Sequence, residues 1–428
     1  RAHRERGWQA DVTSLADRLR LDRLGFKKED VGDDVGAAVV LGVESVPDGL
    51  ASGLLAGVNP VAGLYAYMFG VASAALFTST AFMAVQGTGA MAIIVNDVDI
   101  GGFEDPTRAL VTLSILTGVA MMVAGFFKFG GLLKFVSHSV MTGFISAVGL
   151  NIVLGQVGDF TGYDSDRAGR VGRTIDTLVH PWRMDFWTVT VGLVTIVLIL
   201  ALRRTRLGPM GLVVAVIGGS AVAAVVRAFD REITLVGNVA AVPGRLPAPT
   251  LPDLGEVVIL IIPAVSLAFV GLVQGAGVSA AFGDSDSGPD ATNRDFVGQG
   301  VGNIGAGIFQ GMPVGGSMSA SSLITSGGAR SRFSLIYTFI VMAIVVLLFA
   351  PAVEYIAMPA LAGLLIVVGF ETIKPHDILS VYRTGNVQAA VMVVTFGLTL
   401  AIPLQYAVLL SLIHISSPRD LNPNLVFR

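Results

Sequence analysis

The chain has no cysteine in its 428 residues, which excludes disulfides, thiolate metal sites and iron–sulfur clusters. Its five histidines are scattered and show no metal-ligand spacing, so we expect neither a metal nor a bound cofactor. The H-E-x-x-H zinc helix, the G-x-S-x-G nucleophile elbow and the Walker A loop are also missing. We therefore expect neither an enzyme nor a pump driven by ATP on this chain.

Charge is scarce as well. Only 14% of the residues are charged, 53% are hydrophobic, and the mean hydropathy is +0.74. Because a soluble protein carries roughly 25% charged residues, this composition predicts an all-α polytopic membrane protein surrounded by lipid. The 52 glycines suit close packing of helices in lipid. The net charge of −3 gives no reason to expect nucleic acid as a partner.

Apolar segments follow a charged lead-in at residues 1–33 and predict about fourteen membrane spans, some too short to cross a core of ~30 Å alone. They cover approximately residues 34–57, 60–79, 80–97, 108–128, 132–155, 185–202, 208–228, 255–280, 293–309, 310–326, 333–352, 356–372, 386–400 and 401–416.

The positively charged connections predict the orientation in the membrane. Lys128, Lys134, Arg203, Arg204, Arg206, Arg330 and Arg332 all fall in short connections that share one side if the N-terminus is cytoplasmic. An even number of spans returns the C-terminus to the same side. The long loop 159–184 then lies outside, although it carries four arginines, which four aspartates in the loop and Asp185 beside it offset. We expect a multi-pass protein with both termini in the cytoplasm.

Two stretches inside the apolar body start extended and pass through glycines into helix starts rich in small, hydroxylated residues. They are Ala84–Ile94 (AVQGTGAMAII) and Pro313–Ile324 (PVGGSMSASSLI). Irregular backbone is tolerated at membrane depth only where it lines a cavity or is buried in protein. A helix start there offers unpaired N–H groups and a partial positive charge, which favour an anion. We predict a short strand followed by a half-helix in spans 3 and 10, which is typical of a transporter's substrate site.

The candidate substrate-binding residues belong to these helix starts and to the elements beside them. They are Gln86, Gly87, Thr88, Gly89, Ser317, Met318, Ser319 and Ala320, together with Gln274 on the eighth span and Phe82 as a wall. Gln274 would offer neutral hydrogen bonding to the anion or to Glu44. The alternative is that the glycines and serines form a packing seam between helices, and that Gln274 and Phe82 only pack.

Glu44 and Asp48 lie one helical turn apart on the first span and are the candidate proton-coupling residues. An acid inside the membrane costs roughly 2.5–3.5 kcal/mol on insertion scales, so such acids are usually functional. An interior potential of about −100 mV opposes the entry of each anionic charge by about 2.3 kcal/mol, so uptake needs a co-transported cation. An ionised carboxylate about 6 Å from the anion would repel it by roughly 2.8 kcal/mol at an effective dielectric near 20. Protonation should therefore tighten anion binding. Sodium is the alternative coupling ion. A purely structural alternative is that both acids support a bend at Pro47.

The two halves of the chain echo each other. Glu44 lies 43 residues before Gly87, and Gln274 lies 43 residues before Ser317. Seven spans in each half is an odd number, so the second half must be inverted relative to the first. The spacing thus predicts two inverted seven-span repeats with the site at their pseudo-twofold axis.

Several motifs in order resemble the SulP anion permease family, the sulfate permease and prestin–pendrin group. They are Val46–Ala51 (VPDGLA), Gly57–Gly63 (GVNPVAG), Phe135–Gln156 (FVSHSVMTGFISAVGLNIVLGQ), Asp290–Gly300, Gly302–Arg330 (GNIGAGIFQGMPVGGSMSASSLITSGGAR) and Met358–Gly369 (MPALAGLLIVVG). The resemblance covers roughly residues 34–415 and implies a bacterial-type member in the inner (cytoplasmic) membrane. Because family members are often dimers, a homodimer is one of the oligomeric states that the resemblance allows.

The resemblance implies the uracil-permease-like fold, in which a core domain moves as a rigid body against a gate domain. The core would comprise residues 34–128 and 254–352, and the gate residues 129–253 and 353–416. Residues 1–33 would form a cytoplasmic segment and 417–428 a cytoplasmic tail. Family members usually carry a C-terminal STAS domain, which we expect to be absent from this chain. An arginine common at the tenth-span helix start of animal members is replaced here by Ala320.

These observations predict a secondary active anion transporter, with proton symport as the main interpretation. Sulfate, bicarbonate and small dicarboxylates such as fumarate all remain candidate substrates, because backbone amides and hydroxyls suit an oxyanion without demanding one geometry. The alternatives are a sodium-coupled symporter or anion exchanger, a nucleobase permease of the same fold, and an anion channel.

Overall fold

The computed structural model describes residues 27–130, 138–167, 169–205, 210–283 and 289–402. Most of the predicted N-terminal segment, nearly all of the predicted span 401–416 and the whole tail 417–428 lie outside these residues, as do Lys134 and Arg206.

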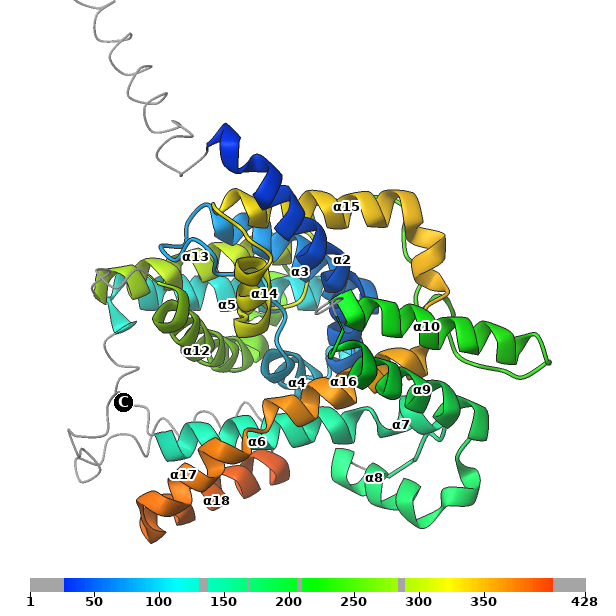
Figure 1. The fold of residues 1–428 in the computed structure, drawn as a ribbon. Coiled ribbons are helices and arrows are strands. Elements are labelled where there is room, and N and C mark those ends of the chain that lie inside the picture. Colours follow the sequence, from blue (N-terminus) through cyan, green and yellow to red (C-terminus); the bar gives the residue numbers. More distant parts are fainter. Residues whose placement is uncertain (1–26, 131–137, 168, 206–209, 284–288, 403–428) are drawn as a thin grey trace, which may run out of the picture.

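Within this part of the chain, the protein is a bundle of helices with one pair of two-residue strands (Figure 1). The elements are α2 (Val31–Leu55), α3 (Pro60–Ala75), β1 (Val85–Gln86), α4 (Gly89–Asp97), α5 (Pro106–Phe126), α6 (His138–Gly155), α7 (Val157–Thr161), α8 (Arg170–Val179), α9 (Phe186–Leu202), α10 (Met210–Arg227), α11 (Val236–Val239), α12 (Val257–Phe282), α13 (Pro289–Ile308), β2 (Gly315–Gly316), α14 (Met318–Ser326), α15 (Phe333–Glu354), α16 (Met358–Thr372), α17 (Pro375–Thr384) and α18 (Asn386–Ala401). Short 3-10 turns lie at Lys28–Asp30, Ile100–Gly102, Pro181–Arg183 and Leu254–Glu256.

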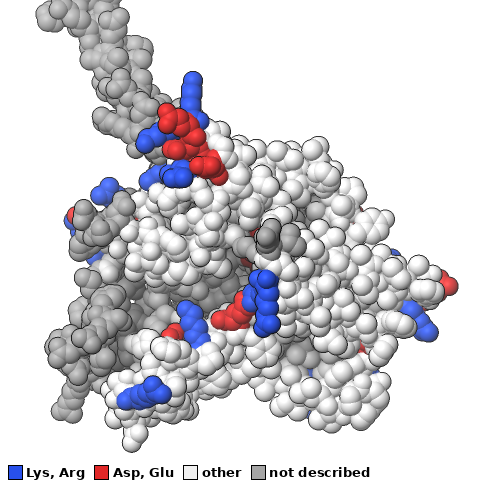
Figure 2. Space-filling model, viewed as in Figure 1, with Lys and Arg blue, Asp and Glu red and all other residues white. Residues whose placement is uncertain are grey.

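Seven helical stretches among the described residues are long and apolar enough to cross a membrane. Three shorter apolar helices, α3, α9 and α18, accompany them. Figure 2 shows a surface that is mostly uncharged on the face in view, with charged side chains confined to small groups, the most prominent near the start of α2. The protein is thus a multi-pass membrane protein, and the count of fourteen spans in two inverted repeats stays a prediction.

Each predicted apolar segment from residue 34 to residue 400 overlaps at least one described helix. The half-helices α4 and α14 have nine residues each, about 14 Å at 1.5 Å per residue and so roughly half of a ~30 Å core. The predicted long connection 159–184 contains the ten-residue helix α8. The connections that hold α11 and α17 are also partly helical. All three helices have ten residues or fewer, so a search for long apolar runs passes over them.

Glycines allow the central helices to approach closely. A Cβ atom added to Gly300 on α13 would lie 2.6 Å from the carbonyl oxygen of Gly118 on α5, and one added to Gly118 would lie 2.5 Å from the carbonyl oxygen of Gly300. No side chain larger than hydrogen fits at this crossing. This is the close backbone approach that the high glycine content predicted.

Two buried carboxylates fix loops at one end of the bundle. Asp34 on α2 accepts hydrogen bonds from the backbone N–H of Arg330 (2.7 Å) and of Ser331 (2.9 Å). Asp295 on α13 accepts in the same way from the N–H of Ser79 (2.6 Å) and of Thr80 (2.9 Å). These carboxylates fix the connection that leaves α14 for α15 and the one that leads from α3 toward β1.

Candidate functional site

The two Gly-rich stretches lie side by side. Val85 pairs with Gly316 and Gln86 with Gly315, so β1 and β2 form an antiparallel ladder. Because each strand leads directly into its half-helix, antiparallel pairing makes α4 and α14 depart in opposite directions from neighbouring starts (Figure 1). Two helix N-termini thus meet inside the bundle.

Hydroxyl side chains cap both helix starts. Thr88 Oγ1 accepts from the N–H of Met91 (3.4 Å), and Ser317 Oγ accepts from the N–H of Ala320 (3.3 Å). The remaining first-turn N–H groups, those of Gly89 and Ala90 in α4 and of Met318 and Ser319 in α14, form no hydrogen bond within the described residues. Their dipoles add to those of the two helices, so the site offers unpaired donors and positive potential from both sides.

The polar face of α13 holds β2 in place. Asn303 forms two hydrogen bonds with the backbone of Val314, donating from Nδ2 to its carbonyl oxygen (2.7 Å) and accepting at Oδ1 from its N–H (2.9 Å). Gln299 Oε1 accepts from the N–H of Gly316 (3.0 Å). Both side chains are fully buried. The sequence analysis missed them, although amides four residues apart inside an apolar segment are a signal that could have pointed to them.

Glycines in these stretches serve packing as well. A Cβ atom on Gly316 would lie 2.7 Å from the Cα of Gly275 on α12, and one on Gly87 would lie 2.7 Å from Tyr67 Cε2 and Met312 Cε. The packing-seam alternative therefore holds for some of the candidate site residues, such as Gly87. It does not account for the unpaired N–H groups at the helix starts.

Gln274 joins α12 to the start of α4. Its Oε1 accepts a hydrogen bond from Thr88 Oγ1 (2.9 Å), and a Cβ atom on Gly315 would lie 3.7 Å from the same oxygen. The side chain is half-buried and lies at the meeting point of the two half-helices. Its partner is Thr88, whereas the sequence analysis considered Glu44 or a bound anion.

Within the acid pair, Asp48 is hydrogen-bonded to a tyrosine that was not among the predicted site residues. Tyr67 Oη on α3 lies 2.8 Å from Asp48 Oδ2, 2.9 Å from the carbonyl oxygen of Gly87 and 2.9 Å from Ser52 Oγ. Tyr67 is nearly fully buried, whereas Asp48 is half-buried. One hydroxyl group thus connects the first-span carboxylate with the backbone just before α4.

Glu44 precedes Asp48 by one turn of α2, which continues through Pro47 as a single helix. Its side chain is half-buried and forms no hydrogen bond with any residue that the structure describes. A carboxylate on this face without a fixed partner is suited to bind a proton or a cation.

The remaining candidates have different surroundings. Gln86 is 1% exposed, and its Nε2 donates to Ser45 Oγ on α2 (2.8 Å), so its amide is committed to packing β1. Met318 is 45% exposed, and the exposed Ser319 has its hydroxyl 3.1 Å from that of Ser317. Phe82 is half-buried and packs against a second apolar cluster, which includes Ala84 and Ala320.

Comparison with known proteins assigns the chain to a family. The model of the sulfate permease family matches residues 32–395. The chain belongs to this family. The Bacillus subtilis protein YvdB is 26% identical over 381 residues, which cover 88% of this chain and 71% of that protein. The chain spans between 56% and 71% of the length of four curated relatives that it matches.

Solved structures share the fold of this sulfate permease family member. The transmembrane domain of the cyanobacterial bicarbonate transporter BicA matches with a TM-score of 0.76 at 22% identity, covering 92% of this chain and 99% of that one. The overall structure of SLC26A9 matches with a TM-score of 0.82 at 18% identity, covering 95% and 68%.

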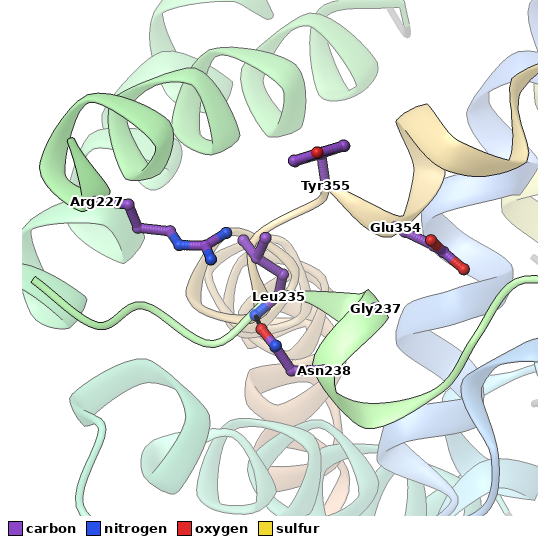
Figure 3. A pocket seen from close by; sticks show the side chains of 6 residues that line it. All are labelled: Arg227, Leu235, Gly237, Asn238, Glu354 and Tyr355. Atoms are coloured by element: carbon purple, nitrogen blue, oxygen red, sulfur yellow. Dashed lines mark hydrogen bonds between the residues drawn. The ribbon is translucent and has the colours of Figure 1, made fainter. Parts of the chain in front are cut away.

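A separate surface pocket of about 240 Å³ lies between the ends of α10 and α15 and the short helix α11 (Figure 3). Arg227 extends into it from α10, opposite Glu354 and Tyr355. Glu354 Oε1 already accepts from the N–H of Val242 (2.8 Å). None of the predicted site residues lines this pocket, so it is distinct from the paired helix starts.

Proposed function

We propose that this sulfate permease family member is a secondary active anion transporter, and that its substrate binds between the starts of α4 and α14. The observation that carries the proposal is a set of four first-turn N–H groups, on two half-helices held together by β1 and β2, that find no partner among the described residues. Partial positive charge from both helices favours an anion over a neutral nucleobase, the runner-up in this fold.

The substrate class follows from the donors at the site. Backbone N–H groups and the exposed hydroxyl of Ser319 suit oxyanions, and Ala320 supplies no guanidinium that would demand one geometry. The family description supports sulfate, and the name of the structural relative BicA supports bicarbonate. Small dicarboxylates such as fumarate satisfy the same chemistry.

Proton coupling would run through Asp48 and Tyr67. The Tyr67 hydroxyl has one proton and faces two acceptors, Asp48 Oδ2 and the carbonyl oxygen of Gly87. Ionised Asp48 attracts that proton, because a hydrogen bond to a charged acceptor is stronger than one to a neutral carbonyl. Once Asp48 is protonated, its own O–H can donate to Tyr67, and Tyr67 can turn its proton to Gly87.

Protonation would thus remove a negative charge beside the anion and strengthen the support of the α4 start. Proton and anion then bind cooperatively, each raising the affinity for the other by the same factor. Glu44, on the same face of α2, provides a second carboxylate for the proton or for a sodium ion. Sodium symport and anion exchange remain the alternatives within this proposal.

Alternating access would move a core of residues 34–128 and 254–352 against a gate of residues 129–253 and 353–416. Two contacts near the site bridge this division. A Cβ atom on Gly89 would collide with Ile152 of α6, and Arg170 of α8 bonds to Asn96 and Asp97 at the end of α4. Both contacts must change if the core moves relative to the gate. With a cytoplasmic N-terminus, α8 would face the outside.

Uptake into proteoliposomes tests the proposal, with labelled sulfate, bicarbonate, fumarate and uracil as the panel. We expect accumulation of at least one anion, faster at an external pH of about 5 than at about 8 and without sodium. Accumulation of uracil alone would replace the proposal with a nucleobase permease. Currents without uphill accumulation would indicate a channel, a sodium requirement would indicate sodium symport, and dependence on an internal anion would indicate exchange.

A further inference from the structure

Helix α8 has its apolar side chains on the side that faces away from the protein. Val171, Ile175, Leu178 and Val179 follow the i, i+4, i+7, i+8 spacing of one helix face and are 41%, 56%, 66% and 59% exposed. Trp182, in the turn that follows, is 73% exposed. In a water-soluble loop this stripe would be expected to turn inward.

The inward side of α8 is polar. Thr174 and Thr177 are buried, and Thr174 Oγ1 lies 3.4 Å from the carbonyl oxygen of Leu154 near the end of α6. Arg170, on the same side, bonds to Asn96 and Asp97. The helix is therefore attached to the bundle through hydroxyls and a guanidinium, and its apolar stripe is left uncovered by every residue that the structure describes.

Helix α8 lies next in the chain to an apolar helix, α9. It is tied to the end of α6, and the chain then leads through Trp182 directly into α9. The outer face of α9 carries Phe186, Leu193 and Val197, which are 71%, 54% and 57% exposed. Figure 1 shows α8 at the edge of the bundle, below α9 in this view. The stripe on α8 thus lies close in sequence to a face whose exposed apolar side chains suit lipid.

We propose that α8 and Trp182 form an interfacial anchor whose partner is the phospholipid layer at the lipid–water boundary. The stripe would lie among the upper acyl chains, with Arg173 and His180 on the opposite side toward water and headgroups. A short helix with one strongly apolar and one charged face is suited to this position, and tryptophan is enriched at such boundaries. The inference concerns the membrane contact alone and holds whatever the protein transports.

Fluorescence quenching tests the anchor in the reconstituted full chain. Replacing Trp8 and Trp187 with Phe leaves Trp182 as the only tryptophan, because the chain has three. We expect phospholipids brominated near the glycerol end of the acyl chain to quench Trp182 several-fold more strongly than aqueous iodide does. Efficient quenching by iodide with little effect of brominated lipid would overturn the proposal.

A matched pair extends the test along the helix. In a background that also carries Trp182→Phe, Leu178→Trp places the probe on the apolar stripe and Arg173→Trp places it on the polar side. The first should respond to brominated lipid and the second to iodide. If position 178 responds to neither quencher, protein covers the stripe and the lipid proposal fails; a second copy is the occupant if dilution in lipid restores quenching. If a substituted chain does not fold, the Trp182 experiment still decides.

Discussion

Arg170 Nη2 on α8 lies 2.9 Å from Asp97 Oδ1, and 2.6 Å from Asn96 Oδ1, at the C-terminal end of α4. Both charged side chains are only about 15% exposed, so water screens the pair less than it would a surface pair. The positive guanidinium also lies at the end of α4 where the helix dipole is negative. The pair stabilises the arrangement seen here, in which the predicted gate rests on the half-helix of the predicted core.

Arg170→Gln should weaken this arrangement by about 1.5–3 kcal/mol, the usual contribution of a hydrogen bond to a charged group. Amide hydrogen exchange of residues 93–97, at the C-terminal end of α4, reports the change through its rate. We expect a several-fold faster rate. Arg167→Gln, which alters an exposed arginine of the same loop, is the control. Equal rates in both variants would mean that the Arg170–Asp97 pair does not stabilise this arrangement.

Tyr67→Phe should flatten the pH dependence of uptake, because the phenyl ring keeps the packing but has no proton to move between Asp48 and Gly87. The ratio of uptake at an external pH of about 5 to that at about 8 should fall toward one. Ser52→Ala removes the third partner of the same hydroxyl and should leave most of the ratio intact. An unchanged ratio in Tyr67→Phe would exclude the tyrosine from coupling, and an unchanged ratio in both Glu44→Gln and Asp48→Asn would exclude the acids.

Ser319→Leu should abolish anion binding while leaving the fold intact, because the side chain is exposed at the start of α14. Ser319→Ala, the matched control, removes only a hydroxyl and should weaken binding by about 1 kcal/mol, roughly five-fold. Binding is measured by displacement of labelled sulfate from purified protein. Undiminished affinity in the leucine variant would place the substrate elsewhere.

Asn303→Leu should destabilise the protein by about 1–3 kcal/mol for each of the two Val314 backbone groups that it leaves unpaired in the core. The measurement is the midpoint of thermal unfolding in detergent. Asn386→Leu, at an exposed position at the start of α18, makes the same chemical change and should shift the midpoint far less. Equal shifts would mean that the amide does not hold β2.

Acid should loosen the loop before α8. Hydrogen bonds from Ser165 and Tyr163 hold the pKa of the Asp176 carboxyl below its usual range. The stability that this carboxylate contributes is fully present above its unfolded pKa of about 3.9 and is lost as the pH falls through the lowered folded-state pKa. Amide hydrogen exchange of residues 163–180, corrected for intrinsic rates, should speed up below about pH 4. In Asp176→Asn this extra step should vanish; if it persists, another group is responsible.

Local sequence patterns predicted several of the helices of this protein. The Gly-x-Gly and Gly-Gly stretches predicted helix starts, and the structure contains helices that begin at Gly89 and Met318. The amphipathic spacing of α8 can also be recognised in the sequence, but a search for long apolar spans passes over it. The substrate and coupling roles assigned to these positions stay predictions.

Contacts between distant parts of the chain could not be read in this way. Tyr67 has the look of an ordinary aromatic residue in an apolar helix, and only folding places its hydroxyl between Asp48 and Gly87. Gln86 is the converse case. The sequence predicts that its amide binds substrate, but in the fold the amide donates to Ser45 Oγ instead. A periodic pattern tells which face of a helix is polar but not which neighbour that face meets.

The pairing of β1 with β2 makes both helix starts parts of one body. A bound anion would then keep the same backbone donors throughout a transport cycle, carried along as cargo, and its intrinsic affinity would be identical on the two sides of the membrane. Any difference between the apparent affinities on the two sides must come from elsewhere. It would reflect how often each side is open and whether the carboxylates of α2 hold a proton when it opens.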